Sequence, residues 1–289
     1  MTVMLKNGDA RLVLSPTEGG CVERYTIGDR NILRPLVRSQ GAGWDARSYA
    51  AFPLFPFCGR IRNGQFFLDG RKISLRANMP PEPRAIHGHT WQEPWKVTAT
   101  DEQSAELSYD YSASEWPWSY KAVQRFELAE HKLTLTLALI NQSTSVMPAG
   151  FGWHPYFERD GAELSARTTG VWQAATDDTK AHLAPLSAAT DLRTRRPVQT
   201  LNVDHCFDLD GVRQTINWPD AEITMTADPI FTKLTVFVPP DEDFFCVEPI
   251  SHVPDAVNMD LPAAETGLHL LAPGEAMTGK IELAVSFRR

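Results

Sequence analysis

The 289-residue sequence has no long hydrophobic run and no cluster of basic residues. Its longest charge-free apolar stretches, residues 51–59 and 133–140, have about half of the ~20 residues that a membrane-spanning helix needs. The 28 basic and 36 acidic residues give a formal net charge of −8, whereas nucleic-acid binding depends on clustered basic side chains. We therefore expect no membrane and no nucleic-acid partner. The first ten residues include Lys6 and Asp9, where a secretory signal is apolar, so the expected compartment is the cytoplasm.

The sequence is also poor in cysteine and lacks the glycine-rich motifs of nucleotide enzymes. Its four cysteines are scattered, with no CxxC pair and no Cys/His spacing typical of metal sites, so we expect reduced and mostly buried thiols. There is no GxxxxGK[ST] loop, no GxGxxG after a strand and no GxSxG elbow. The sequence therefore has no motif for a nucleotide-driven reaction or for a GxSxG-type nucleophilic serine.

The dominant pattern that is present is a side-chain period of two, which is typical of β-strands with two different faces. Four leucines alternate with small or polar residues between Leu133 and Leu139. Asp69-Gly70 separates two short alternating runs and predicts a type I′ hairpin, because both turn positions need a positive φ. Further strands are expected at residues 11–14, 95–99, 106–111, 120–128, 206–209, 223–226, 234–238, 268–271 and 281–287.

No window of 12 or more residues has a convincing helical period, so the predicted class is all-β. With 43% hydrophobic and 22% charged residues the chain is an ordinary globular protein. No linker or repeat divides it, and residues 174–200 are interpreted as a long surface excursion. We expect one domain over residues 1–289, built as a single large antiparallel β-sandwich. The periodicity is equally compatible with a barrel.

Four ionisable residues interrupt apolar or turn-rich segments between residues 51 and 157. Arg60 follows the apolar run of residues 51–59, which would hold a guanidinium rigidly toward ligand oxygens. His87 and His89 are two residues apart, so an extended backbone would place both imidazoles on one side. His154 stands among aromatic residues, where burial lowers the pKa of an imidazole unless a partner holds the proton. A surface or core role remains the alternative for each.

Two carboxylates stand at similar interruptions in the second half. Asp204 enters a predicted strand, where a turn or capping aspartate is the structural alternative. Glu248 follows four apolar residues and precedes a proline, which predicts a carboxylate at the end of a buried strand. A buried charge is expensive without a partner, so Glu248 is either part of a buried salt bridge or a base with a raised pKa.

A cupin-like metal site has a partial match in the sequence. His87, His89 and Glu93 reproduce an HxH-then-E spacing, and imidazoles with a carboxylate are plausible transition-metal ligands. Pro81 stands where that motif has its leading glycine, and the second cupin motif does not fit around His154. We therefore expect no metal and no organic cofactor, and keep a metal-dependent sugar isomerase as a minor alternative.

Five motifs, in this order along the chain, resemble the aldose 1-epimerase (galactose mutarotase) family. The resemblance covers most of the chain, and each motif is weak alone while the ordered set is specific. The family implies a galactose mutarotase-like supersandwich and an acid/base activity that interconverts the α and β anomers of an aldose without a cofactor. The motifs are Gly59-Arg60-Ile-Arg-Asn-Gly64, His87-Gly88, His154-Pro-Tyr-Phe157, Asp204-His-Cys-Phe207, and Cys246-Val-Glu248-Pro with Pro254-Asp-Ala-Val-Asn258.

The resemblance also implies a role for each matched side chain. Glu248 would be the base and His154, when protonated, the acid at the ring oxygen of the sugar. His87 would hydrogen-bond the same oxygen, and Arg60 and Asp204 would orient sugar hydroxyls. The partner is then a small aldose, free or phosphorylated, and the chain a monomer or homodimer. One of the eight tryptophans, such as Trp91 or Trp153, is expected to face the sugar, and the sequence does not choose among them.

The chain departs from the family pattern at three places, and these affect the expected sugar preference more than the reaction. Gly59 stands where the family usually has asparagine, His89 replaces a glycine, and Glu158-Arg159 replaces a common Asn-Leu. The rival interpretation from another class is a carbohydrate-binding β-sandwich without turnover. A pure binder would be free to lose Glu248 or His154, and both are present.

Overall fold

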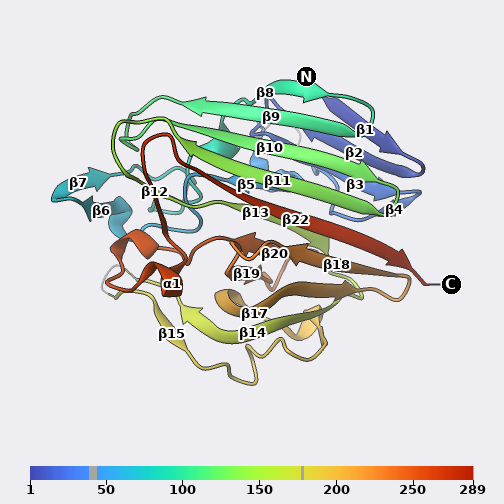
Figure 1. Cartoon of the computed structure of the whole chain (residues 1–289). Coiled ribbons are helices and arrows are strands. Elements are labelled where there is room, and N and C mark those ends of the chain that lie inside the picture. The colour runs from blue at the N-terminus through green and yellow to red at the C-terminus, as the bar shows by residue number, and fades with distance from the viewer. Residues whose placement is uncertain (39–43, 177–178, 289) are drawn as a thin grey trace.

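A large antiparallel sheet that folds back on itself makes up most of the computed structural model (Figure 1). The structure describes residues 1–38, 44–176 and 179–288. One layer contains six strands in the pairing order β8 (Lys96–Thr100), β9 (Ser104–Tyr111), β10 (Tyr120–Ala129), β11 (Lys132–Asn141), β22 (Ala276–Phe287) and β18 (Ala221–Ala227).

The second layer also consists of antiparallel neighbours. Its pairing order is β1 (Val3–Asn7), β2 (Ala10–Ser15), β3 (Cys21–Ile27), β5 (Ala51–Leu54), β13 (Gly152–Glu158), β20 (Phe244–Ile250) and β19 (Lys233–Phe237).

Two long strands, β14 (Glu163–Gln173) and β17 (Asp204–Asn217), connect the layers. The first half of β17 pairs with β19 and its second half with β18. Between these halves the backbone bends at Gly211, whose φ of +125° disfavours a side chain, and the pairing with β14 shifts register twice. Such bulges bend a strand and increase its twist, so one strand can serve both layers.

Short elements complete the chain. β4 (Arg30–Asn31) pairs with β3, while β15 (His182–Ala184) and β16 (Arg196–Pro197) pair with β14. Two small sheets join β6 (Gln65–Leu68) to β7 (Arg71–Ser74) and β12 (Met147–Ala149) to β21 (His269–Leu271). The helical pieces are α1 (Ala263–Thr266) and 3₁₀ turns at Ala46–Ser48, Arg62–Gly64, Thr90–Gln92, Val198–Thr200 and Ala256–Asn258.

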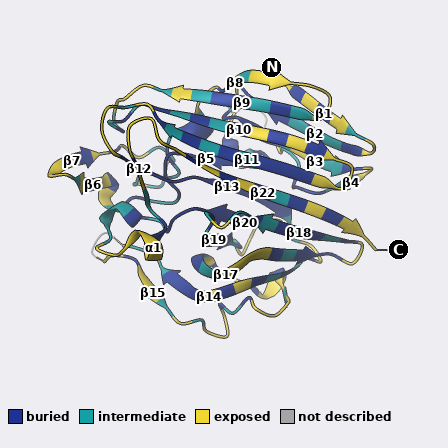
Figure 2. Cartoon of the chain, in the orientation of Figure 1, coloured by how far each residue is buried: buried dark blue, intermediate teal, exposed yellow. Residues whose placement is uncertain are grey.

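The core lies between the two layers and follows the predicted alternation (Figure 2). The leucines of β11 are buried there, as are Phe245 and Val247 of β20. The prediction of an all-β sandwich is confirmed, as are the hairpin at Asp69-Gly70, where φ is +49° and +75°, and the four buried, unpaired cysteines. Within the described residues no helix has the length and apolar character needed to cross a membrane.

Candidate active site

The face of the second layer that points away from the core carries His154 and Glu248. Because side chains alternate along a strand, Cys246 and Glu248 of β20 lie on the face opposite to Phe245 and Val247. Glu248 lies inside β20 rather than at its end, since the strand continues to Ile250. One face of this sheet therefore packs on the apolar core, and the opposite face, here called the second surface, carries ionisable side chains.

Strand register places a row of side chains straight across this second surface. β13 and β20 are antiparallel with Tyr156 opposite Cys246, so His154, two residues earlier, lies opposite Glu248, two residues later. The other strand pairs extend the row in both directions. From β5 to β14 the row consists of Phe52, His154, Glu248, Thr235, Cys206 and Trp172.

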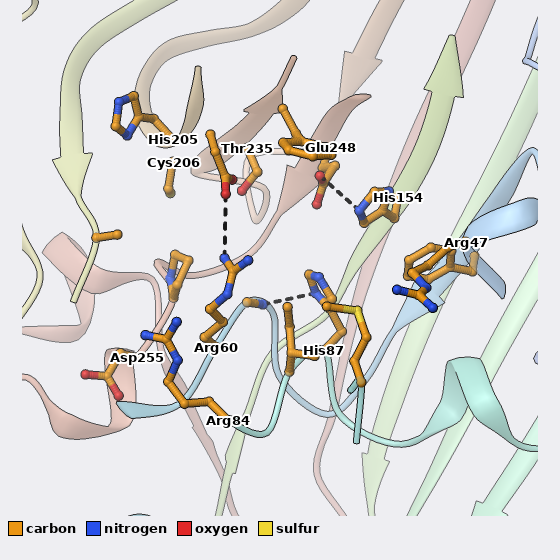
Figure 3. A pocket seen from close by; sticks show the side chains of 18 of the residues that line it. Arg47, Arg60, Arg84, His87, His154, His205, Cys206, Thr235, Glu248 and Asp255 are labelled. Atoms are coloured by element: carbon orange, nitrogen blue, oxygen red, sulfur yellow. Dashed lines mark hydrogen bonds and ion pairs between the residues drawn. The ribbon is translucent and has the colours of Figure 1, made fainter. Parts of the chain in front are cut away.

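All six side chains of this row line one cavity of about 490 Å³. Loops next to the sheet supply Arg60, His87 and other side chains to its walls (Figure 3). Asp204, at the start of β17, also lines the cavity. Such a volume is typical of a small-ligand pocket. The five predicted site residues, far apart in sequence, therefore line a single cavity.

His154 and Glu248 contact each other directly at its floor. Nε2 of His154 lies 3.2 Å from Oε1 of Glu248, and both side chains are more than nine-tenths buried (Figure 3). Burial raises the pKa of Glu248 well above its usual value and lowers the pKa of His154. Both shifts favour the uncharged forms, and the 3.2 Å distance would let a carboxylic acid and a neutral imidazole share one proton.

Aromatic stacking fixes the plane of the His154 ring. Phe52 stacks on it with a centroid distance of 4.4 Å and Tyr156 at 4.8 Å, and these two rings are themselves 6.1 Å apart. Beyond Tyr156 lies the buried guanidinium of Arg34, 4.2 Å from that ring and bonded to the carbonyls of Arg47 and Tyr49. The two stacked neighbours restrict the His154 ring, whose Nε2 points at Glu248.

His87 has a defined tautomer because its Nδ1 accepts a hydrogen bond from the backbone N–H of Gly59 at 3.2 Å. Nε2 therefore carries the proton and is the donor of this side chain. Desolvation lowers the pKa of His87 well below 6.5, with smaller contributions from His154 and Arg60. His87 thus enters the cavity wall as a neutral hydrogen-bond donor.

His89 does not join His87, which corrects the expectation that both imidazoles share one side. His87 and Gly88 both have positive φ, so the segment is a tight turn and not a strand. The ring of His89 stacks on Tyr111 and lines a different cavity. In the described part of the chain, the cupin-like set of His87, His89 and Glu93 is therefore not assembled.

Arg60 is held by a carboxylate that the sequence analysis missed. Its Nε donates to Oε2 of Glu82 at 2.7 Å, and Arg84 donates to Oε1 of the same group at 2.7 Å. Arg60 also lies 3.8 Å from Asp204. Partial burial raises the pKa of Glu82, but the two arginines outweigh it and bring that pKa to about 2. A glutamate among prolines gives no periodic signal in the sequence.

The Pro254–Asn258 motif contacts the backbone on both sides of Arg60. The buried carboxylate of Asp255 accepts hydrogen bonds from the backbone N–H of Arg62 and from Asn258. A β-carbon on Gly59, where φ is +72°, would lie 2.6 Å from the Pro254 ring. The glycine before Arg60 is therefore required by close packing.

The tryptophan in the cavity is Trp172, and not Trp91 or Trp153 as expected from the sequence. Trp153 is buried in the core between the layers, and Trp91 lies behind Phe52. The indole N–H of Trp172 donates to Asp208 at 2.7 Å, and the buried ammonium of Lys233 contacts the same oxygen at 2.8 Å. This pair holds the indole as the far end of the cavity floor.

The similarity of this chain to known proteins extends over nearly its whole length. The family model described as aldose 1-epimerase matches residues 1–284. The chain belongs to the aldose 1-epimerase family. This confirms the resemblance inferred from the ordered motifs and supports the mutarotase activity that the resemblance implied.

Relatives and solved structures agree with this assignment. The chain is 30% identical to the uncharacterized protein YphB of Escherichia coli (strain K12), over 98% of both chains. A galactose mutarotase-like protein from Clostridium acetobutylicum has a TM-score of 0.88 at 17% identity, covering 99% of this chain and 95% of the other. Galactose 1-epimerase from Lactobacillus acidophilus has a TM-score of 0.80 at 15% identity, with 100% and 95% covered. The two structures share the fold.

The departures from the aldose 1-epimerase pattern lie mostly outside the cavity. Glu158 accepts a hydrogen bond from Asn31, and Arg159 donates to the carbonyls of Pro239 and Pro240. Neither side chain lines the cavity, so the expected effect of these two residues on sugar preference has no structural basis. Gly59 does line it, and a β-carbon there would meet the Pro254 ring.

Proposed function

We propose that this chain is an aldose 1-epimerase that opens and recloses the ring of an aldose. The observation that carries the proposal is the direct contact between His154 and Glu248 at the floor of a sugar-sized cavity. Anomer exchange needs one group that takes the proton of the C1 hydroxyl and one that gives a proton to the ring oxygen. A shared-proton pair provides both, and each positioned proton-transfer group typically contributes about 10²–10⁴ in rate.

In the proposed reaction, the anomeric hydroxyl and the ring oxygen take the place of the direct contact. The carboxylate of Glu248 removes the C1 hydroxyl proton while the C1–O5 bond breaks and His154 protonates O5. The products are an aldehyde and an O5 hydroxyl. After rotation about C1–C2 the proton transfers run backward and close the ring on the other face. The reaction needs Glu248 as a carboxylate and His154 as an imidazolium. This charged pair contains as many protons as the uncharged pair, so transfer of the shared proton from Glu248 to His154 is enough to form it.

The remaining site residues act on charge and orientation in this proposal. Nε2–H of His87 donates to the ring oxygen as negative charge develops there, which stabilises the transition state. Arg60 donates to sugar hydroxyls, and Asp204 accepts from them. Trp172 presents an apolar surface to the sugar. Together these contacts would fix the hemiacetal over His154 and Glu248.

We further propose an uncharged aldose as substrate. Four arginines line the cavity, and each already faces a carboxylate: Arg47 pairs with Asp45, Arg60 and Arg84 with Glu82, and Arg62 with Asp255. A phosphate would have to compete with these carboxylates for the guanidinium groups. Comparing anomerisation of glucose and galactose with that of their 6-phosphates tests this point, and faster turnover of the phosphates would contradict it.

The polarimetric rate of freshly dissolved α-anomer tests the function itself. The unmodified protein should accelerate mutarotation, while Glu248→Gln and His154→Asn should each lose at least about 10²-fold of that acceleration. Glu106→Gln, which changes a half-buried carboxylate of β9 outside the cavity, should keep it. Sugar binding without acceleration by the unmodified protein would instead support the carbohydrate-binding interpretation.

The working unit in this proposal is a single domain of residues 1–289, acting in the cytoplasm. The shared sheet supports the first part, because β13 pairs with both β5 and β20, and β11 pairs with β22, so strands from both halves of the chain alternate in it. Four buried, unpaired thiols support the second, since disulfides are rare in a reducing compartment. Limited proteolysis should leave the full-length chain as the smallest stable fragment.

A further inference from the structure

Three potential metal ligands of different chemistry meet at the cavity floor. His154, Cys246 and Glu248 each have one donor atom within 4.8 Å of the other two. Cys246 and Glu248 are two residues apart on β20 and therefore project from the same face. His154 faces them from β13. Strand register alone thus brings an imidazole, a thiol and a carboxylate to one corner of the sheet.

We propose that these three side chains form a binding site for a divalent transition-metal ion, with Zn²⁺ as the preferred ion. Zn²⁺ takes His nitrogen, Cys sulfur and carboxylate oxygen, and sites with three protein ligands leave a fourth position for water or a ligand. Here the fourth position would open onto the cavity, which both His154 and Glu248 line. The site goes beyond the proposed sugar chemistry, which uses no metal.

The geometry is close to what zinc needs. Ligands at about 2.0–2.2 Å from a tetrahedral ion are separated by about 3.3–3.5 Å, and Nε2 of His154 already lies 3.2 Å from Oε1 of Glu248. Only the thiol of Cys246 has to close in, and a change of its single side-chain torsion moves the sulfur. Paired strands on both sides of β20 keep the backbone in place.

The local chemistry also favours a soft or borderline ion over Mg²⁺ or Ca²⁺. Those ions need six or more oxygen ligands, whereas this cluster offers one carboxylate. A thiolate and a carboxylate together balance the two charges of Zn²⁺, so the buried ion brings no net charge. Oε2 of Glu248 makes no hydrogen bond within the described residues, so the carboxylate loses only its contact with His154 when the metal binds.

Metal binding and sugar turnover would exclude each other. The ion takes both groups to which we assign proton transfer, so Zn²⁺ should act as an inhibitor and not as a cofactor. This consequence rests on the proposed function, while binding itself does not. Binding is therefore measured first, without turnover.

Co²⁺ is the probe, because a thiolate bound to Co²⁺ gives a near-ultraviolet charge-transfer band. Titration of the full-length protein with Co²⁺ should develop this band with one ion per chain, and Zn²⁺ should abolish it by displacement. Cys246→Ser should lose the band. Cys58→Ser is the matched control: Cys58 is a buried thiol of the same apolar cluster but is not in the metal-ligand group, and it should keep the band.

A second variant keeps the test decisive if Cys246→Ser does not fold. Glu248→Gln retains the thiol and should bind Zn²⁺ at least about 10-fold more weakly, since even the loss of an outer hydrogen-bond partner costs 10–100-fold in metal affinity. Absence of the band in the unmodified protein, or its persistence in Cys246→Ser, would overturn the proposal. Inhibition of mutarotation by Zn²⁺ and its reversal by a chelator then test the consequence. If the unmodified protein binds the metal ion but does not accelerate mutarotation, this contradicts the proposed function and not the metal site.

Discussion

Oε2 of Glu82 accepts a hydrogen bond from Nε of Arg60 over 2.7 Å, and this contact sets the direction of the guanidinium at the cavity wall. The carboxylate is 10% exposed and touches no part of the proposed reaction centre. Glu82 is therefore a positioning residue, which acts on the sugar through Arg60. Its second hydrogen bond, from Arg84, holds the carboxylate in place.

Glu82→Gln should weaken sugar binding more than it slows chemistry. Replacing the carboxylate removes a charge-assisted hydrogen bond worth about 1.5–3 kcal/mol, so kcat/KM should fall roughly 10- to 100-fold, mainly through a higher KM. Steady-state polarimetry over a range of sugar concentrations measures both constants. Glu115→Gln is the control, because Glu115 binds Arg76 outside this cavity. An equal loss in both variants would mean a general effect on folding.

The same contact predicts a pH dependence of stability. The pKa of Glu82 is about 2 in the folded protein against 4.5 for an ordinary glutamate, so the folded state prefers the ionised form. Its contribution is fully present above about pH 4.5 and is lost as the pH falls toward 2. The difference in unfolding free energy between the unmodified protein and Glu82→Gln should shrink over this window. Urea unfolding at neutral pH and at about pH 3 measures it, and a constant difference would contradict the assignment.

The sequence predicted the strands that have one polar face and missed several that have none. β11 alternates because its two faces meet different environments, and its bounds were nearly right. β5 and β13 are buried on both faces, so their residues show no period of two. The ordered motifs identified His154, Glu248 and their partners in the cavity. Their mutual contact follows from register between distant strands, which sequence spacing does not encode.

The residues that escaped prediction act through other side chains. Glu82 lies in a proline-rich loop, and Asp208 and Lys233 occupy ordinary strand positions. Only the folded structure brings Glu82 to Arg60, or Asp208 to Trp172. Arg34 likewise precedes a proline in a segment without periodicity, and its role beside Tyr156 depends on stacking. The proposed acid, base and sugar-binding residues of the sequence analysis lie in ordered motifs, whereas Glu82, Asp208, Lys233 and Arg34 lie in none.

Gly88 should be irreplaceable for a steric reason. A β-carbon there would lie 1.7 Å from the carbonyl oxygen of Phe55, and φ is +68°. Gly88→Ala should cost more than about 3 kcal/mol of stability and lower kcat by moving His87. Gly70→Ala is the control: φ is +75° but nothing lies within 4 Å of the added carbon, so only the left-handed conformation costs, about 1–2 kcal/mol. Urea unfolding and polarimetry compare them, and equal losses of stability would refute the steric argument.

Asp208 should matter to both stability and sugar binding, because its carboxylate holds Lys233 and Trp172 together. The Lys233 side chain is only 4% exposed, so Asp208→Ala leaves a buried ammonium without its counter-charge. Losing one partner of such a pair costs about 3–5 kcal/mol.

Asp208→Ala should also raise KM, because the Trp172 indole loses its hydrogen-bond acceptor. The value of kcat should change less, since His154 and Glu248 are untouched. Asp210→Ala, two residues along β17, removes a surface pair with Arg167 in which both side chains are 68% exposed, and should cost about 0–1 kcal/mol. Thermal or urea unfolding together with steady-state polarimetry separates the two variants. If the Asp208→Ala variant folds and its KM is unchanged, Trp172 does not contact the sugar.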